Sequence, residues 1–252
     1  MASTIEADDN LLRARVLDAE RLSDKTGTPR FLGFLDQRER ALCESWLSPY
    51  RDRLCFYGGY DDAERTVLGV FPIGDLPEPS WAPVTALGFA YRTEKQLTHR
   101  DFLGTLMSAG VKRSSVGDIL CGEGLTVAFI HTDILPFLLS EITCVGGEGV
   151  RLIPDYDGEL PLAHRFRDMS DTVASARLDC VVAALCRMSR GDAAEAITAG
   201  RVTLRFLPCE SVSATVRAGD TLSVRGCGKF RITELDALTR KGRLILRAQQ
   251  YI

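Results

Sequence analysis

The fold class of this chain is decided by residues 177–202, which read RLDCVVAALCRMSRGDAAEAITAGRV. The first half predicts an amphipathic helix opened by Arg177, because its apolar side chains share one helical face. These side chains are Leu178, Val181, Val182 and Leu185. Ser189 predicts the N-cap of a second helix with Asp192 as its capping-box partner, and Gly200 predicts the end of that helix. Two short helices joined by a tight turn therefore begin this part of the chain.

Strands are predicted after the two helices, at 202–206, 221–225 and 244–248. Residues 175–252 thus form a C-terminal module of two helices followed by strands. The module is basic, because from residue 177 onward 13 Lys/Arg stand against 7 Asp/Glu, whereas the preceding residues carry 18 against 27. A basic module on an acidic protein suits a polyanion such as RNA, and the alternative is an uneven distribution of charge without function.

Three arginines of this module are placed to contact phosphates: Arg177, Arg190 and Arg201. Arg190 lies in the first turn of the second helix, where backbone N–H groups and the helix dipole attract an anion. Each guanidinium group can bind a phosphate through two parallel hydrogen bonds, and the alternative is an ordinary solvated arginine. Ser189, Arg225 and Lys229 complete the candidate RNA contacts of the module.

The middle of the chain, 81–155, has the order strand, helix, strand, strand, helix, strand. The predicted elements are 84–91, 98–110, 116–121, 125–130, 132–141 and 150–153. This order predicts a ferredoxin-like βαββαβ domain of the kind found in RNA-recognition (RRM-like) domains. Many enzymes and other binding modules use the same arrangement, so it does not specify a function.

A second candidate RNA patch lies around the first helix of this middle domain. His99 and Arg100 open the helix, and Lys112 and Arg113 follow its end. The alternative is an ordinary polar loop, and no carboxylate or nucleophile pairs with His99 to indicate catalysis. Three aromatic residues on predicted strands fit either base stacking or core packing. They are Phe89, Tyr91 and Phe129.

The first 76 residues predict a smaller α/β part with 10 basic against 15 acidic residues over the first 80 positions. Residues 1–10 are predicted as a frayed polar end, followed by helices at 11–22 and 31–47 and strands at 54–57 and 66–71. The acidic character suits contact with a protein partner. The chain is therefore predicted to be an α+β protein of three parts, 1–76, 81–155 and 175–252, with linkers at 72–83 and 154–172.

The eight cysteines form no Cys-x-x-Cys pair, which predicts reduced, mostly buried thiols rather than disulfides. The three histidines lie near no paired cysteines, so neither a metal nor a cofactor is predicted. No signal peptide is recognised at the start, and no apolar stretch reaches the roughly 20 residues that span a bilayer. We therefore expect a cytoplasmic monomer that contacts no membrane.

The C-terminal motifs resemble the S4 RNA-binding domain. The similar segments are Arg-Leu-Asp at 177–179, Ser-Arg at 189–190, Gly-Arg-Val at 200–202 and Gly-Asp at 219–220. Upstream, THRDFLG at 98–104 and VGDIL at 116–120 resemble the central domain of the bacterial YlmH family. The chain departs from the S4 pattern after the Gly-Arg-Val strand, where Arg205-Phe206-Leu207 replaces the usual Asn-Gly turn.

This resemblance implies a protein that binds structured RNA, both rRNA and tRNA, on the large ribosomal subunit. It further implies a role in ribosome-associated quality control, the rescue of stalled subunits that still hold peptidyl-tRNA. Catalysis is not expected, because the chain carries no Walker loop, no glycine-rich loop leading into a helix and no separate catalytic domain. The alternatives are a cell-division-linked adaptor and an accessory RNA-binding subunit of an RNA-modifying enzyme.

Overall fold

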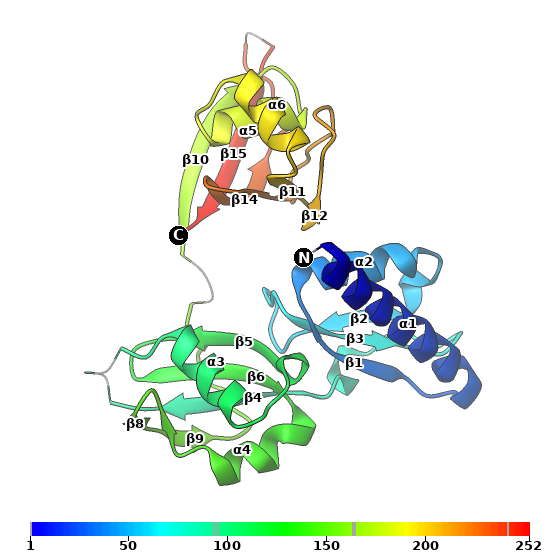
Figure 1. Ribbon diagram of the computed structural model, residues 1–252, viewed down its shortest axis with the longest axis vertical. Coiled ribbons are helices and arrows are strands. Elements are labelled where there is room, and N and C mark those ends of the chain that lie inside the picture. The colour runs from blue at the N-terminus through cyan, green and yellow to red at the C-terminus, as the bar shows by residue number, and fades with distance from the viewer. Residues whose placement is uncertain (1, 93, 95, 163–164, 241) are drawn as a thin grey trace. The chain divides into compact units, whose positions relative to one another are not determined.

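The computed structural model describes residues 2–92, 94, 96–162, 165–240 and 242–252. These residues form helices and antiparallel sheets, so the predicted α+β class is confirmed (Figure 1). The chain divides into two compact units, Met1–Ala163 and His164–Ile252, which we call the N-terminal unit and the C-terminal unit.

The N-terminal unit begins with a small antiparallel sheet covered by helices (Figure 1). Its elements are α1 (Ala2–Thr26), β1 (Arg30–Leu35), α2 (Gln37–Trp46), a 3₁₀ segment (Ser48–Arg53), β2 (Leu54–Tyr57) and β3 (Thr66–Val70). The strand order is β1-β3-β2, which confirms the two strands predicted from the sequence. A core of aliphatic side chains joins α1 and α2 to the sheet, and Val16 and Leu68 are fully buried in it.

Two sequence-based predictions in this region are wrong. The helix predicted over 31–47 is β1 followed by α2, because Asp36 caps a new helix in the middle of that range. The Glu39 N–H donates to Asp36 Oδ1 at 2.8 Å and the Asp36 N–H donates to Glu39 Oε2 at 2.7 Å. The polar end 1–10 is also helical from Ala2 onward, and its Asp9 is paired with Arg38 of α2, with Arg38 Nη1 2.8 Å from Asp9 Oδ1.

The second half of the N-terminal unit has the predicted order of elements. They are β4 (Val84–Ala90), α3 (His99–Ser108), β5 (Val116–Cys121), β6 (Leu125–His131), α4 (Leu135–Glu141), β7 (Cys144–Val145), β8 (Glu148–Gly149) and β9 (Arg151–Ile153). Their main sheet has the order β5-β6-β4-β9 with antiparallel neighbours. The predicted capping box of α3 is present, since the Thr98 N–H donates to Asp101 Oδ2 at 2.8 Å.

The two halves of the N-terminal unit share one hydrophobic core. Phe34 and Val67 pack with Leu120, Val127 and Phe129 of the second half. Between the halves, the chain over 71–83 is irregular apart from a 3₁₀ turn at Pro79–Trp81. The predicted parts 1–76 and 81–155 therefore lie within a single compact unit.

The aromatic residues of the second half pack in the interior. Phe89 and Phe129 are buried, and the Tyr91 hydroxyl donates to the Gly122 carbonyl at 2.8 Å. Core packing is therefore the correct interpretation of Phe89 and Phe129.

The C-terminal unit is a sheet of six antiparallel strands with two helices on one face (Figure 1). Its elements are β10 (Phe166–Val173), α5 (Leu178–Leu185), α6 (Arg190–Thr198), β11 (Val202–Leu204), β12 (Leu207–Pro208), β13 (Thr221–Val224), β14 (Gly228–Glu234) and β15 (Leu244–Tyr251). The predicted apolar stripe of α5 packs on sheet residues such as Leu222 and Phe230. The two helices and their ends agree with the sequence-based prediction.

The linker predicted over 154–172 is wrong from Phe166 onward, because β10 pairs with β15 along its whole length, from Phe166↔Tyr251 to Val173↔Leu244. Its sequence, FRDMSDTV, is polar because β10 is an edge strand with most side chains exposed. The C-terminal unit thus begins before the predicted boundary at 175, and β14 is a strand that the sequence reading missed.

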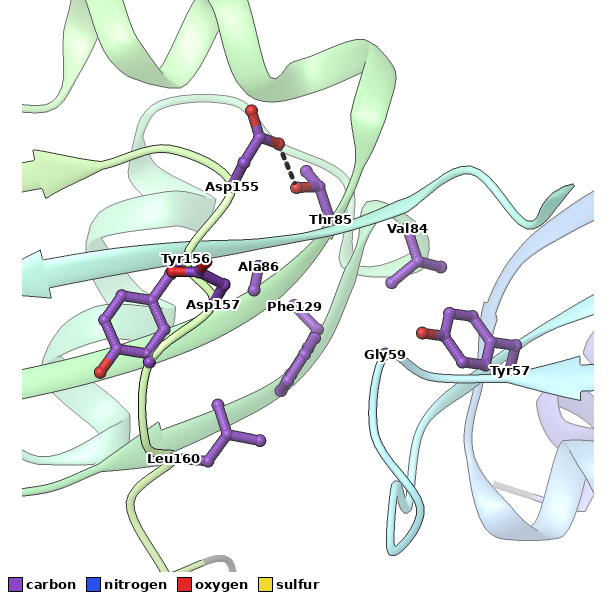
Figure 2. Close-up of a pocket in the computed structure, with 11 residues that line it drawn as sticks. Tyr57, Gly59, Val84, Thr85, Ala86, Phe129, Asp155, Tyr156, Asp157 and Leu160 are labelled. Carbon is purple, nitrogen blue, oxygen red and sulfur yellow. Dashed lines mark hydrogen bonds between the residues drawn. The ribbon is translucent and has the colours of Figure 1, made fainter. Parts of the chain in front are cut away.

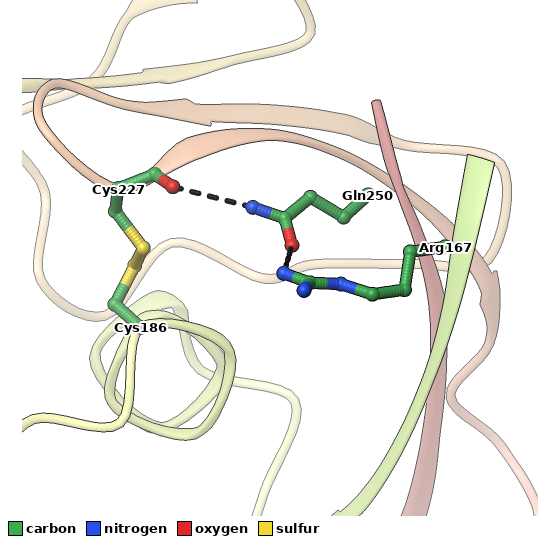
Figure 3. Close-up of a disulfide and its surroundings, with 4 residues drawn as sticks. All are labelled: Arg167, Cys186, Cys227 and Gln250. Atoms are coloured by element: carbon green, nitrogen blue, oxygen red, sulfur yellow. Dashed lines mark hydrogen bonds between the residues drawn. A yellow bond between two sulfur atoms is a disulfide. The ribbon is translucent and has the colours of Figure 1, made fainter. Parts of the chain in front are cut away.

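The prediction that cysteines are reduced is wrong for Cys186 and Cys227, which form a disulfide (Figure 3). Their Cα atoms are 5.8 Å apart, and the bond joins the end of α5 to the turn between β13 and β14. Gln250 Nε2 donates to the Cys227 carbonyl at 3.3 Å, and Arg167 donates to the Gln250 side-chain oxygen. The two cysteines are 41 positions apart and meet only when the hairpin folds over the helix, so their spacing carries no signal.

The other six cysteines are free thiols. Cys43, Cys55 and Cys180 are buried, as the sequence predicts. Burial, with a smaller contribution from Glu39, raises the pKa of Cys43 to about 12, so this thiol is protonated and unreactive at neutral pH.

Candidate nucleic-acid interface

Two of the predicted arginines converge on one buried carboxylate in the C-terminal unit. Arg177, the N-cap of α5, places Nε 3.1 Å from Asp179 Oδ1, and Arg190, the first residue of α6, places Nη2 2.6 Å from Asp179 Oδ2. The Asp179 side chain is 5% exposed, whereas those of Arg177 and Arg190 are 45% and 61% exposed. The carboxylate therefore holds two guanidinium groups side by side at the surface, and the cluster keeps a net positive charge.

The electrostatics of this cluster favour the charged forms. Burial alone raises the pKa of Asp179, but the hydrogen bonds from Arg190 and Arg177 outweigh burial and lower it to about 2. The hydrogen bond to Asp179 likewise raises the pKa of Arg190. The ion pairs use only some of the five N–H donors of each guanidinium, and the remaining donors are available to an anion from solvent.

Ser189 has a structural contact beside this cluster. Its Oγ accepts a hydrogen bond from the Asp192 N–H at 3.1 Å, which confirms the predicted N-cap of α6. Among the contacts of the described residues, the reciprocal one from the Ser189 N–H to the Asp192 side chain is absent, so the predicted capping box is only half formed. Ser189 therefore fixes where α6 begins, and so where Arg190 emerges next to the exposed N–H groups of the first helical turn.

Arg201 and Arg225 lie together, but at the other end of α6. The Arg225 N–H donates to the Arg201 carbonyl at 2.9 Å, so both side chains start from the same end of the β11–β13 pair, and both are exposed. Arg201 also pairs with Glu195, with Nη2 3.4 Å from Oε1. Since α6 has nine residues, about 14 Å of helix separates this pair from Arg190. The predicted arginines thus form two separate groups.

Lys229 belongs to neither group. Its Nζ lies 4.4 Å from the centre of the Tyr251 ring and 5.8 Å from that of the Phe206 ring. Both neighbouring strand positions, Gly228 and Phe230, pair within the sheet, and Phe230 is buried under the helices. Since side chains alternate along a strand, Lys229 points to the sheet face opposite α5 and α6.

The predicted patch of the N-terminal unit is only partly exposed. Arg113 donates from Nη1 to the Val116 carbonyl at 2.5 Å, and burial together with the nearby Arg65 charge lowers its pKa to about 10. Partial desolvation and the Arg113 charge lower the pKa of His99. The side chains of Arg100 and Lys112 are exposed at the start of α3 and in the loop after it. Arg113 is thus committed to the fold, whereas Arg100 and Lys112 are accessible.

Asp118, which the sequence does not single out as functional, links the two halves of the N-terminal unit. Its Oδ2 accepts from the Tyr60 hydroxyl at 2.9 Å and from the Glu64 N–H at 2.7 Å. Asp179 was not predicted to have a role either. Its position between Arg177 and the second helix is nevertheless a pattern that indicates a carboxylate partner for the arginines.

A pocket of about 380 Å³ lies in the N-terminal unit (Figure 2). Tyr57 and Phe129 contribute to its walls, and Thr85 Oγ1 donates to Asp155 Oδ1 at 2.7 Å. Asp155 and Asp157 are exposed, and the described residues that line the pocket include neither lysine nor arginine. Two carboxylates without a neighbouring cation repel phosphate groups, so this pocket is not part of a surface for a polyanion.

Among the described residues, no group of three or more His, Cys, Asp or Glu side chains is arranged to hold a metal ion. No helix in the described part of the chain is long and apolar enough to span a membrane.

Comparison with known proteins finds a matching family model, a related protein and similar solved structures. The family model described as "Putative RNA-binding domain in YlmH" matches residues 89–156. A Bacillus subtilis (strain 168) protein, "Ribosome-associated protein quality control protein P2", is 31% identical over 244 residues, which cover 93% of this chain and 92% of that protein. The solved structure "Cell division protein ylmH from Streptococcus pneumoniae" is similar in fold, with a TM-score of 0.52, 16% identity and coverage of 58% of this chain and 90% of that one. The chain belongs to the YlmH family.

Proposed function

We propose that this protein is a non-catalytic RNA-binding protein that contacts structured RNA through the α5–α6 side of its C-terminal unit. The observation that carries the proposal is the convergence of Arg177 and Arg190 on Asp179 at the N-terminus of α6. Two fixed guanidinium groups beside the first turn of α6 suit phosphate oxygens, because Arg binds phosphate bidentately and a helix N-terminus attracts anions. The description of the matched family model as an RNA-binding domain supports the same activity.

The RNA we propose is that of the large ribosomal subunit, rRNA together with tRNA. The Bacillus relative is named for ribosome-associated protein quality control, which supports a role in rescuing stalled subunits that carry peptidyl-tRNA. Binding is expected to depend on phosphate position and helix shape, because the major groove of A-form RNA hides its base edges. The proposal assigns the protein to the cytoplasm and requires no cofactor.

We also propose which domain type each part of the chain forms. The strand order β5-β6-β4-β9 with α3 and α4 supports a ferredoxin-like domain at 81–155, whose exposed Arg100 and Lys112 offer a second RNA contact. The C-terminal unit is proposed to be an S4-like domain extended at its start by β10. The acidic residues 1–76 are proposed as the part that contacts a protein partner.

Co-sedimentation with separated ribosomal subunits, with and without bound tRNA, tests the proposal. The wild-type protein should travel with the large subunit, and raising the salt concentration should release it, because phosphate contacts displace counterions. Arg190→Glu should abolish co-sedimentation, while Arg21→Glu, at an exposed arginine of α1, should not.

Binding that is insensitive to salt and to Arg190→Glu would contradict the proposal. If the protein stays at the top of every gradient, the cell-division role suggested by the name of the pneumococcal protein becomes the better explanation.

A further inference from the structure

The sheet of the C-terminal unit has a second face that α5 and α6 do not cover (Figure 1). Leu222, Phe230 and Leu246 point toward the helices and are buried, so the residues between them along each strand point the other way. We call this second side the outer sheet face. Its cationic residues are Lys229 and Arg231 on β14 and Arg247 on β15.

A row of aromatic rings and a cation lies at one end of the outer sheet face. Phe166 and Tyr251 are directly paired across β10 and β15, with ring centres 4.9 Å apart and ring planes at 67°. Lys229 Nζ lies over the Tyr251 ring at 4.4 Å and near the Phe206 ring at 5.8 Å. The row Phe206–Lys229–Tyr251–Phe166 thus brings together residues that are far apart in the sequence. Phe166 is 37% exposed.

The backbone at Phe206 provides an independent observation. Arg205 and Phe206 form the turn between β11 and β12 with φ angles of +52° and +68°. Side chains with a Cβ disfavour this region, and a two-residue hairpin turn of this kind normally carries Asn and Gly. Strained backbone persists only where the surrounding structure holds it, and such positions cluster at active and binding sites. At this turn the strain places an aromatic ring beside Lys229.

The charges of the outer sheet face suit a nucleic acid strand. Lys229, Arg231 and Arg247 outnumber the carboxylates of Glu234 and Asp168 on the same face. Glu234 pairs with Arg247 at 3.2 Å, whereas Asp168 accepts a hydrogen bond from the uncharged Gln249 at 3.2 Å and keeps its charge. Aromatic rings that alternate with cations bind single strands, because unstacked bases lie on the rings while the cations contact phosphates. A duplex keeps its bases stacked inside and cannot use the rings in this way.

We infer that the outer sheet face binds single-stranded RNA, with bases against Phe206 and the Phe166–Tyr251 pair and a phosphate near Lys229 and Arg231. This inference rests on the proposed RNA-binding function but uses the face opposite to Arg177 and Arg190. One protein can then hold a duplex on its helical side and an adjoining unpaired segment on its sheet side.

Phe206→Gly is the decisive variant, because glycine adopts a positive φ without strain. The substitution removes the ring without weakening the turn, so a loss of binding cannot be attributed to unfolding. Fluorescence anisotropy with the full chain and a labelled oligouridylate of roughly 12 nucleotides, a length typical of single-strand binding modules, measures the affinity. The Kd should rise about fivefold or more for Phe206→Gly and stay near wild type for Phe206→Trp. Phe137→Ala, at an exposed aromatic residue of α4, is the matched control and should bind like wild type.

A parallel titration with a hairpin RNA separates this inference from the proposed function. Phe206→Gly should leave the hairpin affinity unchanged, whereas Arg190→Glu should reduce it. If Phe206→Gly binds the oligouridylate like wild type, or weakens both RNAs equally, the outer sheet face is not a single-strand site even though Arg190-dependent hairpin binding stands. If wild-type protein binds neither RNA, the proposed function and this inference both fail.

Discussion

Arg205 clamps Asp220 with two hydrogen bonds, Nε to Oδ1 at 2.7 Å and Nη2 to Oδ2 at 2.9 Å. Asp220 is nearly buried, and its Oδ2 also accepts from the Arg217 N–H at 2.8 Å. The contact ties the strained turn after β11 to the loop before β13. In this unusual turn, Arg205 thus stabilises the fold, while Phe206 places its ring near Lys229.

Asp220→Asn should lower the free energy of unfolding by about 1–2 kcal/mol, because an amide replaces two charge-assisted hydrogen bonds with weaker ones. Chemical denaturation of the variant and wild type measures the difference. Asp236→Asn, at an exposed position of the same unit, is the control and should unfold like wild type. An equal effect of both variants would show that the Arg205 contact does not stabilise the turn.

The lowered pKa of Asp179 makes its contribution to stability depend on pH. Burial opposes the shift, but the contacts to Arg190 and Arg177 bring the pKa from 3.8 to about 2. A carboxyl group with a lower pKa in the folded state stabilises the fold above its unfolded pKa and loses that contribution as the pH falls through the folded pKa. The free energy of unfolding of the wild type should therefore exceed that of Asp179→Asn by about 2 kcal/mol near pH 5. This difference should vanish as the pH falls toward about 2. Urea denaturation across this range measures it, and a constant difference would contradict the assigned ion pairs.

Ser189 allows stability and RNA binding to be separated. Ser189→Ala removes the cap of α6 and should cost about 1 kcal/mol, with RNA affinity largely kept. Ser189→Asp keeps a good cap but places a negative charge beside Arg190, so stability should hold while RNA affinity falls. Denaturation midpoints and hairpin-RNA titrations of the two variants should show opposite patterns. Loss of RNA binding in Ser189→Ala alone would instead assign a direct RNA contact to the hydroxyl.

The disulfide should contribute measurably to the C-terminal unit. Closing a loop of 41 residues restricts the unfolded chain and is worth about 4 kcal/mol in the chain-entropy account. Cys186→Ser should therefore unfold at a lower denaturant concentration than the oxidised wild type. Adding a reductant should lower the denaturation midpoint of the wild type to that of the variant. The midpoint of the variant itself should not change. Cys144→Ser, at an exposed free thiol, should behave like wild type in both conditions.

Features governed by neighbours in sequence were readable from the sequence. The capping box of Thr98 and Asp101, the Ser189 cap and the glycine that ends α6 each act within a few residues, so their local signals suffice. The edge strand β10 was not readable, because its identity depends on β15 about 80 residues later. Even β1 was obscured, since its apolar residues also suit a helix and only the Asp36 capping box separates the two elements.

The same distinction between local signals and tertiary contacts applies to the residues of the candidate site. The residue types and their places at helix ends predicted which arginines to consider, and Arg177 and Arg190 do meet. The sequence could not show that Arg201 lies at the far end of α6, that Arg113 is bound to backbone carbonyls, or that Lys229 faces the other side of the sheet. These outcomes depend on the register of strands and on burial, which are set by tertiary packing.

The position of β15 between β10 and β14 affects how this protein can fold during its own synthesis. Within the C-terminal unit, β10 is synthesised first and β15 last of the strands. Because Phe166 pairs with Tyr251, β10 stays unpaired until β15 has been synthesised. Until residue 251 has left the ribosomal exit tunnel, β10 and β14 both present open edges, and the two helices have only part of a sheet to cover. This unit therefore cannot complete its sheet until β15 has emerged, and a nascent chain halted before β15 cannot assemble the surface that the complete sheet carries.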